Sequence, residues 1–143
     1  MSQKDNLMQL IKQQIDVERE YAKHLAEVKD KVGIAAARLL LLEMHLNAEK
    51  HAAILTEMLE ILKKAPPGVS TWDYELEEYS DVALMRKEFE RHVEKESGTF
   101  ARLKEELKRK NDKGLNMLFA NIEEDEKRHY KILQAIIEEL FVK

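Results

Sequence analysis

The amino-acid sequence predicts an all-α protein, a bundle of four long helices arranged as two antiparallel hairpins with a long crossover between them. Gly (4) and Pro (2) are scarce among the 143 residues, which argues against a sheet protein with many turns. Hydrophobic residues make up 44% and charged residues 36%, which is enough apolar material for a core inside a charged shell. The helix-breaking residues leave segments of matched length, as a four-helix bundle requires.

The helix-breaking clusters define the elements in order. Gly33 separates the first two helices, Pro66–Gly68 follows the second, and Asn111–Gly114 separates the last two. The first and last breaks are short, so each joins an antiparallel hairpin, whereas the middle stretch is long enough to cross the bundle. We expect one domain, residues 1–143, with helices over about 4–31, 34–64, 81–111 and 114–142 and a crossover over 65–80.

Charge and composition exclude several classes of function. The formal net charge is -4, so no nucleic-acid partner is expected. The absence of Cys excludes disulfides and thiolate metal sites. No apolar run reaches about 18 residues, so no membrane span is expected. The polar start of the chain does not resemble a signal peptide, and we expect a cytoplasmic protein.

A weak internal repeat relates the two halves of the chain. Glu49–Leu55 resembles Lys127–Leu133 when their histidines are aligned, and Val17–Glu20 resembles Val93–Glu96. Each predicted hairpin therefore looks like a copy of the other.

Polar side chains interrupt the apolar stripe of every predicted helix. On helical wheels at about 100° per residue, a Glu or a His lies on or beside each stripe. These residues are roughly four to five helical turns from the hairpin turns, so we expect them at one height in the bundle. The residues placed in this layer are Glu18, His51, Glu96, Glu126 and His129.

Such a layer favours a metal site. Buried carboxylates are costly unless they are paired, hydrogen-bonded or bound to a metal. Carboxylate oxygens and imidazole nitrogens suit iron, manganese or zinc. The three-residue spacing of Glu126 and His129 puts both on one helix face, where they can hold one ion. The alternative is a metal-free polar network that fixes how the helices pack.

Two further sets of residues were assigned from the helical wheels and the internal repeat. In the third helix, Glu96 is the ligand by core geometry, whereas Glu94 is the match by the internal repeat. His24 and His45 lie off the apolar stripes, and we expect both at the surface.

With these residues, the chain resembles the ferritin-like superfamily, in particular its rubrerythrin-like single-domain members. The family pattern is Glu on helix one, Glu-x-x-His on helix two, Glu on helix three and Glu-x-x-His on helix four. Glu18, His51, Glu126 and His129 match this pattern, and the match covers nearly the whole chain. The resemblance implies a diiron-carboxylate site, although manganese or zinc are alternatives.

The resemblance has one departure. The second-helix Glu, a bridging ligand in the family, falls on Ala48. Asn47, His92 and Asp125 lie near the layer and are the residues able to compensate, or the site holds a single ion. The chain has no Cys and hence no rubredoxin-type iron centre, so a separate electron donor would be needed for redox chemistry.

Three functions follow as expectations. The resemblance implies an iron-dependent oxidase or a peroxide-reducing enzyme. The alternative is a non-catalytic binding or assembly module in which the metal site is degenerate or structural. Iron storage in a cage is the third, and it would need many subunits. We expect a homodimer.

Overall fold

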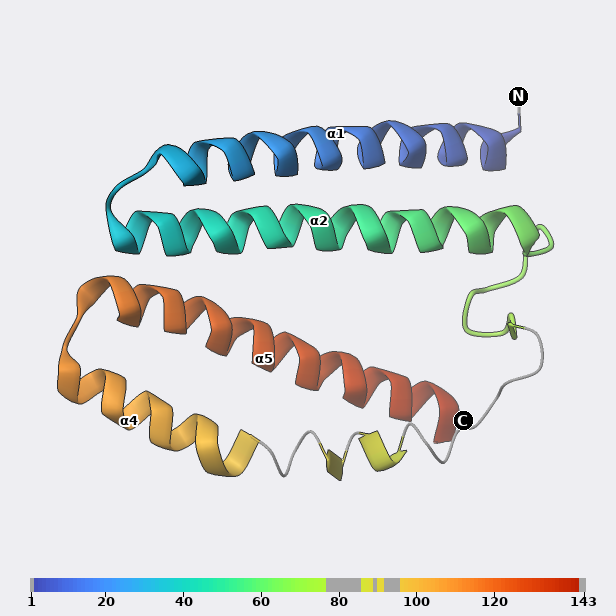
Figure 1. Ribbon diagram of the computed structural model, residues 1–143. Coiled ribbons are helices and arrows are strands. Elements are labelled where there is room, and N and C mark those ends of the chain that lie inside the picture. Colours follow the sequence, from blue (N-terminus) through green and yellow to red (C-terminus); the bar gives the residue numbers. More distant parts are fainter. Residues whose placement is uncertain (1, 77–85, 89, 92–95, 142–143) are drawn as a thin grey trace. The chain divides into compact units, whose positions relative to one another are not determined.

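The computed structural model describes residues 2–76, 86–88, 90–91 and 96–141, with the backbone alone described at 96–97 and 140–141. Every regular element among these residues is a helix, which confirms the all-α class. The elements are α1 (Gln3–Lys31), α2 (Ala35–Lys64), the π-helix η1 (Glu96–Phe100), α4 (Ala101–Lys110) and α5 (Lys113–Phe141) (Figure 1).

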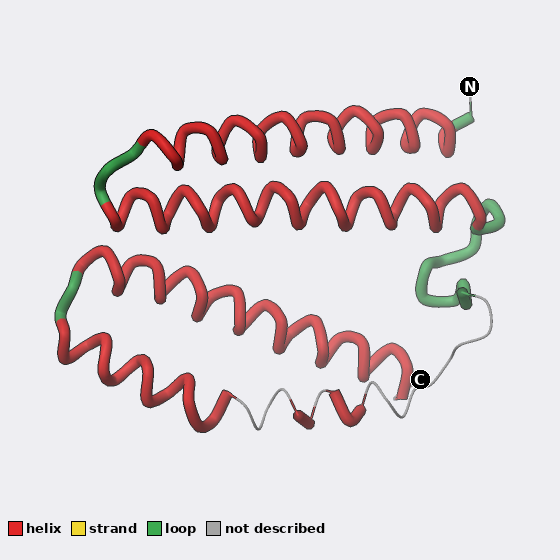
Figure 2. The backbone as a smooth tube through the Cα atoms, in the orientation of Figure 1, coloured by secondary structure: helices red, strands yellow, loops and turns green. Residues whose placement is uncertain are grey.

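The chain divides into two compact units, Met1–Tyr74 and Glu75–Lys143, and each is described by itself. In the first, α1 and α2 run antiparallel on either side of a short loop (Figure 2). In the second, another short loop joins α4 to α5. Both hairpins agree with the predicted positions of the short breaks. The single domain over residues 1–143 stays a prediction.

Local interactions fix both ends of α1. The Ser2 hydroxyl accepts a hydrogen bond from the Asp5 backbone N–H at 3.1 Å, and the Asp5 side chain reaches back to the Ser2 backbone N–H, which forms a capping box. At the other end, the Arg38 guanidinium donates to the carbonyls of Asp30 and Val32. These carbonyls have no partner within the helix, so Arg38 secures the turn into α2.

The core of the first unit lies between α1 and α2. Ile11, Ile15 and Leu59 form a buried cluster. Further along the hairpin, buried small residues let the two helices approach closely. These are Ala22, Ala48 and Ala52, with exposed fractions of 5%, 3% and 6%.

In the second unit, α4 ends at Asn111, which adopts the left-handed conformation with φ 53°. Its N–H donates to the carbonyls of Leu107 and Lys108, and the next residue, Asp112, accepts from the Leu115 N–H at the start of α5. The Lys104 ammonium lies 2.7 Å from the Glu123 carboxylate and joins the two helices. This hydrogen bond holds the pKa of Glu123 below its ordinary value.

Three predicted helices agree with the structure to within one residue or so at each end. The third expected helix, 81–111, differs. Its described residues are helical as far as Lys110, but η1 is a π-helix, which the sequence pattern did not predict. Such turns hold one residue more than an α-helical turn, so the helical wheel loses its register there.

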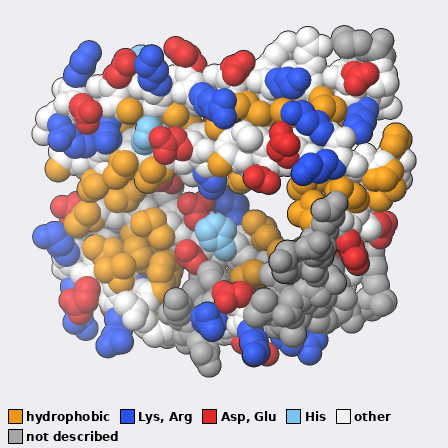
Figure 3. Space-filling model, turned by 45° about the vertical axis from the view of Figure 1, so that its right-hand side comes forward, with side chains coloured by type: hydrophobic (Ala, Val, Ile, Leu, Met, Phe, Trp, Pro, Cys, Tyr) orange, Lys and Arg blue, Asp and Glu red, His pale blue; other side chains and the backbone are white. Residues whose placement is uncertain are grey.

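Many apolar side chains remain exposed between charged ones (Figure 3). Within the described residues, no helix is both long enough and apolar enough to cross a membrane.

Candidate metal centre

The structure brings together the first two predicted ligands. Glu18 on α1 and His51 on α2 face each other across the hairpin, with Glu18 Oε1 3.6 Å from His51 Nδ1. This distance is too long for a hydrogen bond, so the two groups are close without being locked together. The Glu18 side chain is 17% exposed and that of His51 is 50% exposed. Both line one hollow on the same side of the hairpin. The helical wheels placed His51 at the centre of the apolar stripe, whereas within the described unit its side chain is half exposed.

Gln14 orients the Glu18 carboxylate. Its side-chain amide, one helical turn before Glu18, donates to Glu18 Oε1 at 3.3 Å. The same oxygen also faces His51. Neither contact uses Oε2, which leaves that oxygen available to a cation.

A hollow of about 280 Å³ lies beside this pair. Tyr21 and Asn47 line it together with Glu18 and His51, and Asn47 is one of the residues named above as able to compensate for the missing glutamate. Ala48 lies at its base and is 3% exposed. If a glutamate replaced this alanine, its backbone and Cβ would therefore be buried against α1.

The second pair of predicted ligands lies on α5. His129 Nδ1 is 3.8 Å from Glu126 Oε1, and the two side chains are 50% and 29% exposed. Residues three apart are neighbours on any α-helix, so this proximity requires no packing between helices. Asp125, named as a compensating ligand, forms an ion pair with Arg128 one turn further along.

The remaining candidates are only partly described. Glu96 begins η1, and its side chain lies outside the described part of the chain. His92 and Glu94 lie outside the described residues altogether. The choice between Glu94 and Glu96 therefore stays open. Glu96 was preferred from a helical wheel with regular α-helical periodicity, and the π-helix does not have that periodicity.

Within the described residues, no group of three or more His, Asp or Glu side chains is placed to hold a metal ion. Among the described residues, the first unit supplies two carboxylate–imidazole pairs, Glu18 with His51 and Glu49 with His45, and the second supplies Glu126 with His129. No protein-family model matches the sequence, and neither a curated protein nor a solved structure matches it.

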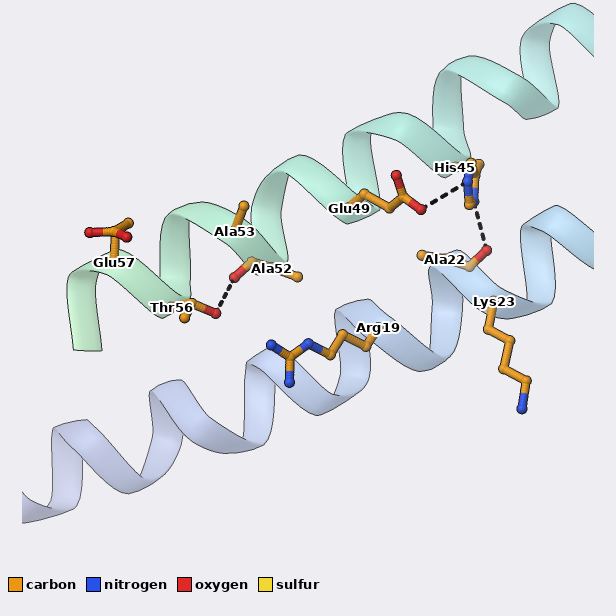
Figure 4. Close-up of a pocket in the computed structure, with 9 residues that line it drawn as sticks. All are labelled: Arg19, Ala22, Lys23, His45, Glu49, Ala52, Ala53, Thr56 and Glu57. Carbon is orange, nitrogen blue, oxygen red and sulfur yellow. Dashed lines mark hydrogen bonds and ion pairs between the residues drawn. The ribbon is translucent and has the colours of Figure 1, made fainter. Parts of the chain in front are cut away.

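Sequence reasoning missed the role of His45. Its Nδ1 lies 2.8 Å from the Ala22 carbonyl on α1, and its Nε2 lies 3.1 Å from Glu49 Oε1 (Figure 4). The side chain is 16% exposed, so the expectation that His45 lies at the surface is wrong, while that for His24 is confirmed. The four-residue spacing of His45 and Glu49 was the available signal.

Proposed function

We propose that this chain is a metal-binding protein of the ferritin-like type, with iron as its preferred ion. In this proposal the two hairpins pair into a four-helix bundle, and their carboxylate–imidazole pairs hold iron at its centre. The proposed ligands are Glu18, His51, Glu126 and His129, with Glu96 as the expected ligand from the third helix.

The observation that carries the proposal is the pairing of Glu18 with His51 across two helices. These residues are 33 positions apart in the sequence, and only the packing of α1 against α2 brings them together. Gln14 holds the Glu18 carboxylate through Oε1, and the other oxygen is a suitable metal donor beside the imidazole of His51.

The exposed apolar side chains support the bundle. Tyr21 and Met44 flank the first pair and are 46% and 42% exposed within their unit. On α5, Ile122 and Ile132 share the helix face of His129 and are 42% and 55% exposed. Apolar faces of this kind usually mark an interface. Pairing the two faces would bury them and would bring the four polar residues into one layer.

Iron held by such oxygen and nitrogen donors supplies one-electron chemistry toward dioxygen or peroxide. This chain's own residues would bind and orient the ion: Glu18 and His51 from one hairpin, Glu126 and His129 from the other. Peroxide reduction would need an electron donor from another protein for repeated turnover, whereas in ferrous-iron oxidation the Fe(II) substrate itself would supply the electrons. The expected activity is ferrous-iron oxidation or peroxide reduction.

Anaerobic titration with Fe(II) tests the proposal. We expect about one or two ions per chain, and loss of loading in Glu18→Ala, His51→Ala, Glu126→Ala and His129→Ala. His24→Ala is the matched control, since His24 is an exposed histidine of α1 outside both pairs. Protein that binds neither Fe(II), Mn(II) nor Zn(II), and gains no thermal stability from them, would contradict the proposal.

The burial of Ala48 favours a second candidate function, that of a non-catalytic binding or assembly module whose metal site is structural or degenerate. Ala48 packs at 3% exposure where the family's bridging carboxylate would stand. Peroxide consumption by the ferrous protein separates the two. Turnover above that of free iron supports the enzyme, and its absence despite bound iron supports the module.

A further inference from the structure

The hollow beside Glu18 and His51 contains one oxidisable group that the proposed iron site does not use, the thioether of Met44. The proposed ligands offer oxygen and nitrogen atoms, which suit iron, whereas a thioether is a soft ligand that suits other metals. In the proposed site, Met44 therefore lies beside the ligands without being one of them. Met44 is 42% exposed within the first unit, so a small molecule that enters the hollow can reach its sulfur.

Met58 provides a comparison on the same helix. Met44 stands seven residues before His51 and Met58 seven residues after it, and both methionines are 42% exposed. Both are described residues, but Met44 lines the hollow and Met58 lies outside it. Side chains on a helix lean toward its N-terminus, so the His51 imidazole leans toward Met44 and away from Met58. The two thioethers are thus equally exposed and differ in their position relative to the candidate ligands.

The hollow is large enough for the small oxidant that the proposed activity uses. Its volume is about 280 Å³, whereas a water molecule occupies roughly 30 Å³ and hydrogen peroxide about twice that volume. Peroxide that is held near Glu18 and His51 therefore shares one space with the Met44 sulfur.

We propose that Met44 is a peroxide-dependent modification site beside the metal centre, an inference that rests on the proposed function. The O–O bond of hydrogen peroxide breaks, one oxygen atom forms a bond with the Met44 sulfur, and the other leaves as water with both hydrogens. The thioether loses two electrons and becomes a sulfoxide, and the peroxide is reduced by the same two electrons.

The modification changes the face of α2 on which Met44 lies. A sulfoxide is polar, whereas Met44 belongs to the exposed apolar side chains that the second hairpin covers in the proposed bundle. Oxidation of Met44 therefore weakens the pairing of the two hairpins, and with it the shared centre. Because methionine sulfoxide can be reduced enzymatically, the modification is reversible.

Peptide mass spectrometry of the full chain after treatment with hydrogen peroxide tests the selectivity. Without iron, oxidation should follow exposure, so the rates at Met44 and Met58 should agree within about twofold. After loading with Fe(II), Met44 should react at least about tenfold faster than Met58, because peroxide is then held beside it. His51→Ala should remove this preference. Equal rates at Met44 and Met58 in the iron-loaded chain would overturn the proposal.

Thermal unfolding tests the consequence for the fold. After treatment with Fe(II) and peroxide, the wild type and the control Met58→Leu should melt at a lower temperature than before treatment. Met44→Leu keeps an apolar side chain of similar volume without the sulfur, so its melting temperature should be unchanged. An equal loss in Met44→Leu and the wild type would also overturn the proposal.

Fe(II) binding is measured on the same samples, which separates this inference from the proposed function. A chain that binds iron but oxidises Met44 no faster than Met58 contradicts this inference alone. A chain that binds no iron contradicts both.

Discussion

The two units hold their helices together in different ways. In the first, the contact between α1 and α2 buries the Ile11, Ile15 and Leu59 cluster and three alanines. Among the described residues of the second, Phe119 reaches a similar burial, and its ring lies 4.9 Å from that of Phe100. The ion pair between Lys104 and Glu123 adds a polar link there.

The two candidate ligand pairs also differ in what holds their members close together. Glu18 and His51 are neighbours only while the first hairpin is packed. Glu126 and His129 are neighbours wherever α5 is helical. A ligand pair from one helix therefore follows from helical periodicity, whereas a pair from two helices depends on the core between them. Loosening the first hairpin should therefore affect one pair and spare the other.

The largest effect is expected in the core of the first unit. Leu59→Ala removes part of the buried cluster and should lower the free energy of unfolding by about 2–4 kcal/mol. Urea denaturation measures it. Leu10→Ala is the matched control, since Leu10 is 62% exposed, and it should cost less than about 1 kcal/mol. Equal losses in the two variants would show that the α1–α2 contact is not the main core.

A second, smaller effect is expected for Ala48→Glu at the candidate site. A carboxylate introduced at this buried position should lower the stability of the metal-free protein by about 2–3 kcal/mol. The hollow beside it gives the new side chain access to an ion, so added Fe(II) should restore the loss. Thermal unfolding with and without Fe(II) measures both effects. A loss that Fe(II) leaves unchanged would argue against a site beside Ala48.

A smaller effect is expected at the link between His45 and α1. His45→Ala removes the contact with the Ala22 carbonyl and the partner of Glu49, and should cost about 1 kcal/mol. The measurement is again urea denaturation, with the exposed His24→Ala as control. If the two variants were equally stable, the His45 contact would contribute nothing to the hairpin.

The smallest effect concerns pH in the second unit. Lys104 lowers the pKa of Glu123 below its ordinary value of 4.5 in the folded chain. The ion pair therefore contributes stability above that ordinary value, and the contribution is lost as the pH falls through the lower folded pKa. NMR titration of the Glu123 carboxyl in Lys104→Met should show its pKa rising toward the ordinary value. No change would mean that Lys104 does not hold this carboxylate.

Much of the helical organisation could be predicted from the sequence, because it depends on local signals. Gly33 and the Asn111–Gly114 cluster marked the two short breaks, and Asn111 adopts the left-handed conformation that ends a helix. The pairing of Glu18 with His51 was also predictable, since counting turns from a short hairpin fixes which residues lie level.

Other features could not be predicted, for physical reasons. The π-helix at Glu96–Phe100 departs from the regular period on which a helical wheel depends. The spacing of His45 and Glu49 indicated their ion pair, but the contact of His45 with the Ala22 carbonyl could not be predicted, because residue types do not show where a backbone acceptor lies. The burial of Ala48 depends on how closely two helices approach, which a sequence pattern does not measure.

The proposed function requires one metal centre shared by both hairpins, and paramagnetic NMR can detect such a centre. Mn(II) would be added below one equivalent while the ring signals of all five histidines are followed. The signals of His51 and His129 should broaden together and in proportion, and more strongly than that of His24, which lies six residues from Glu18 on α1. Broadening of only one of the two, or of neither, would contradict a shared centre.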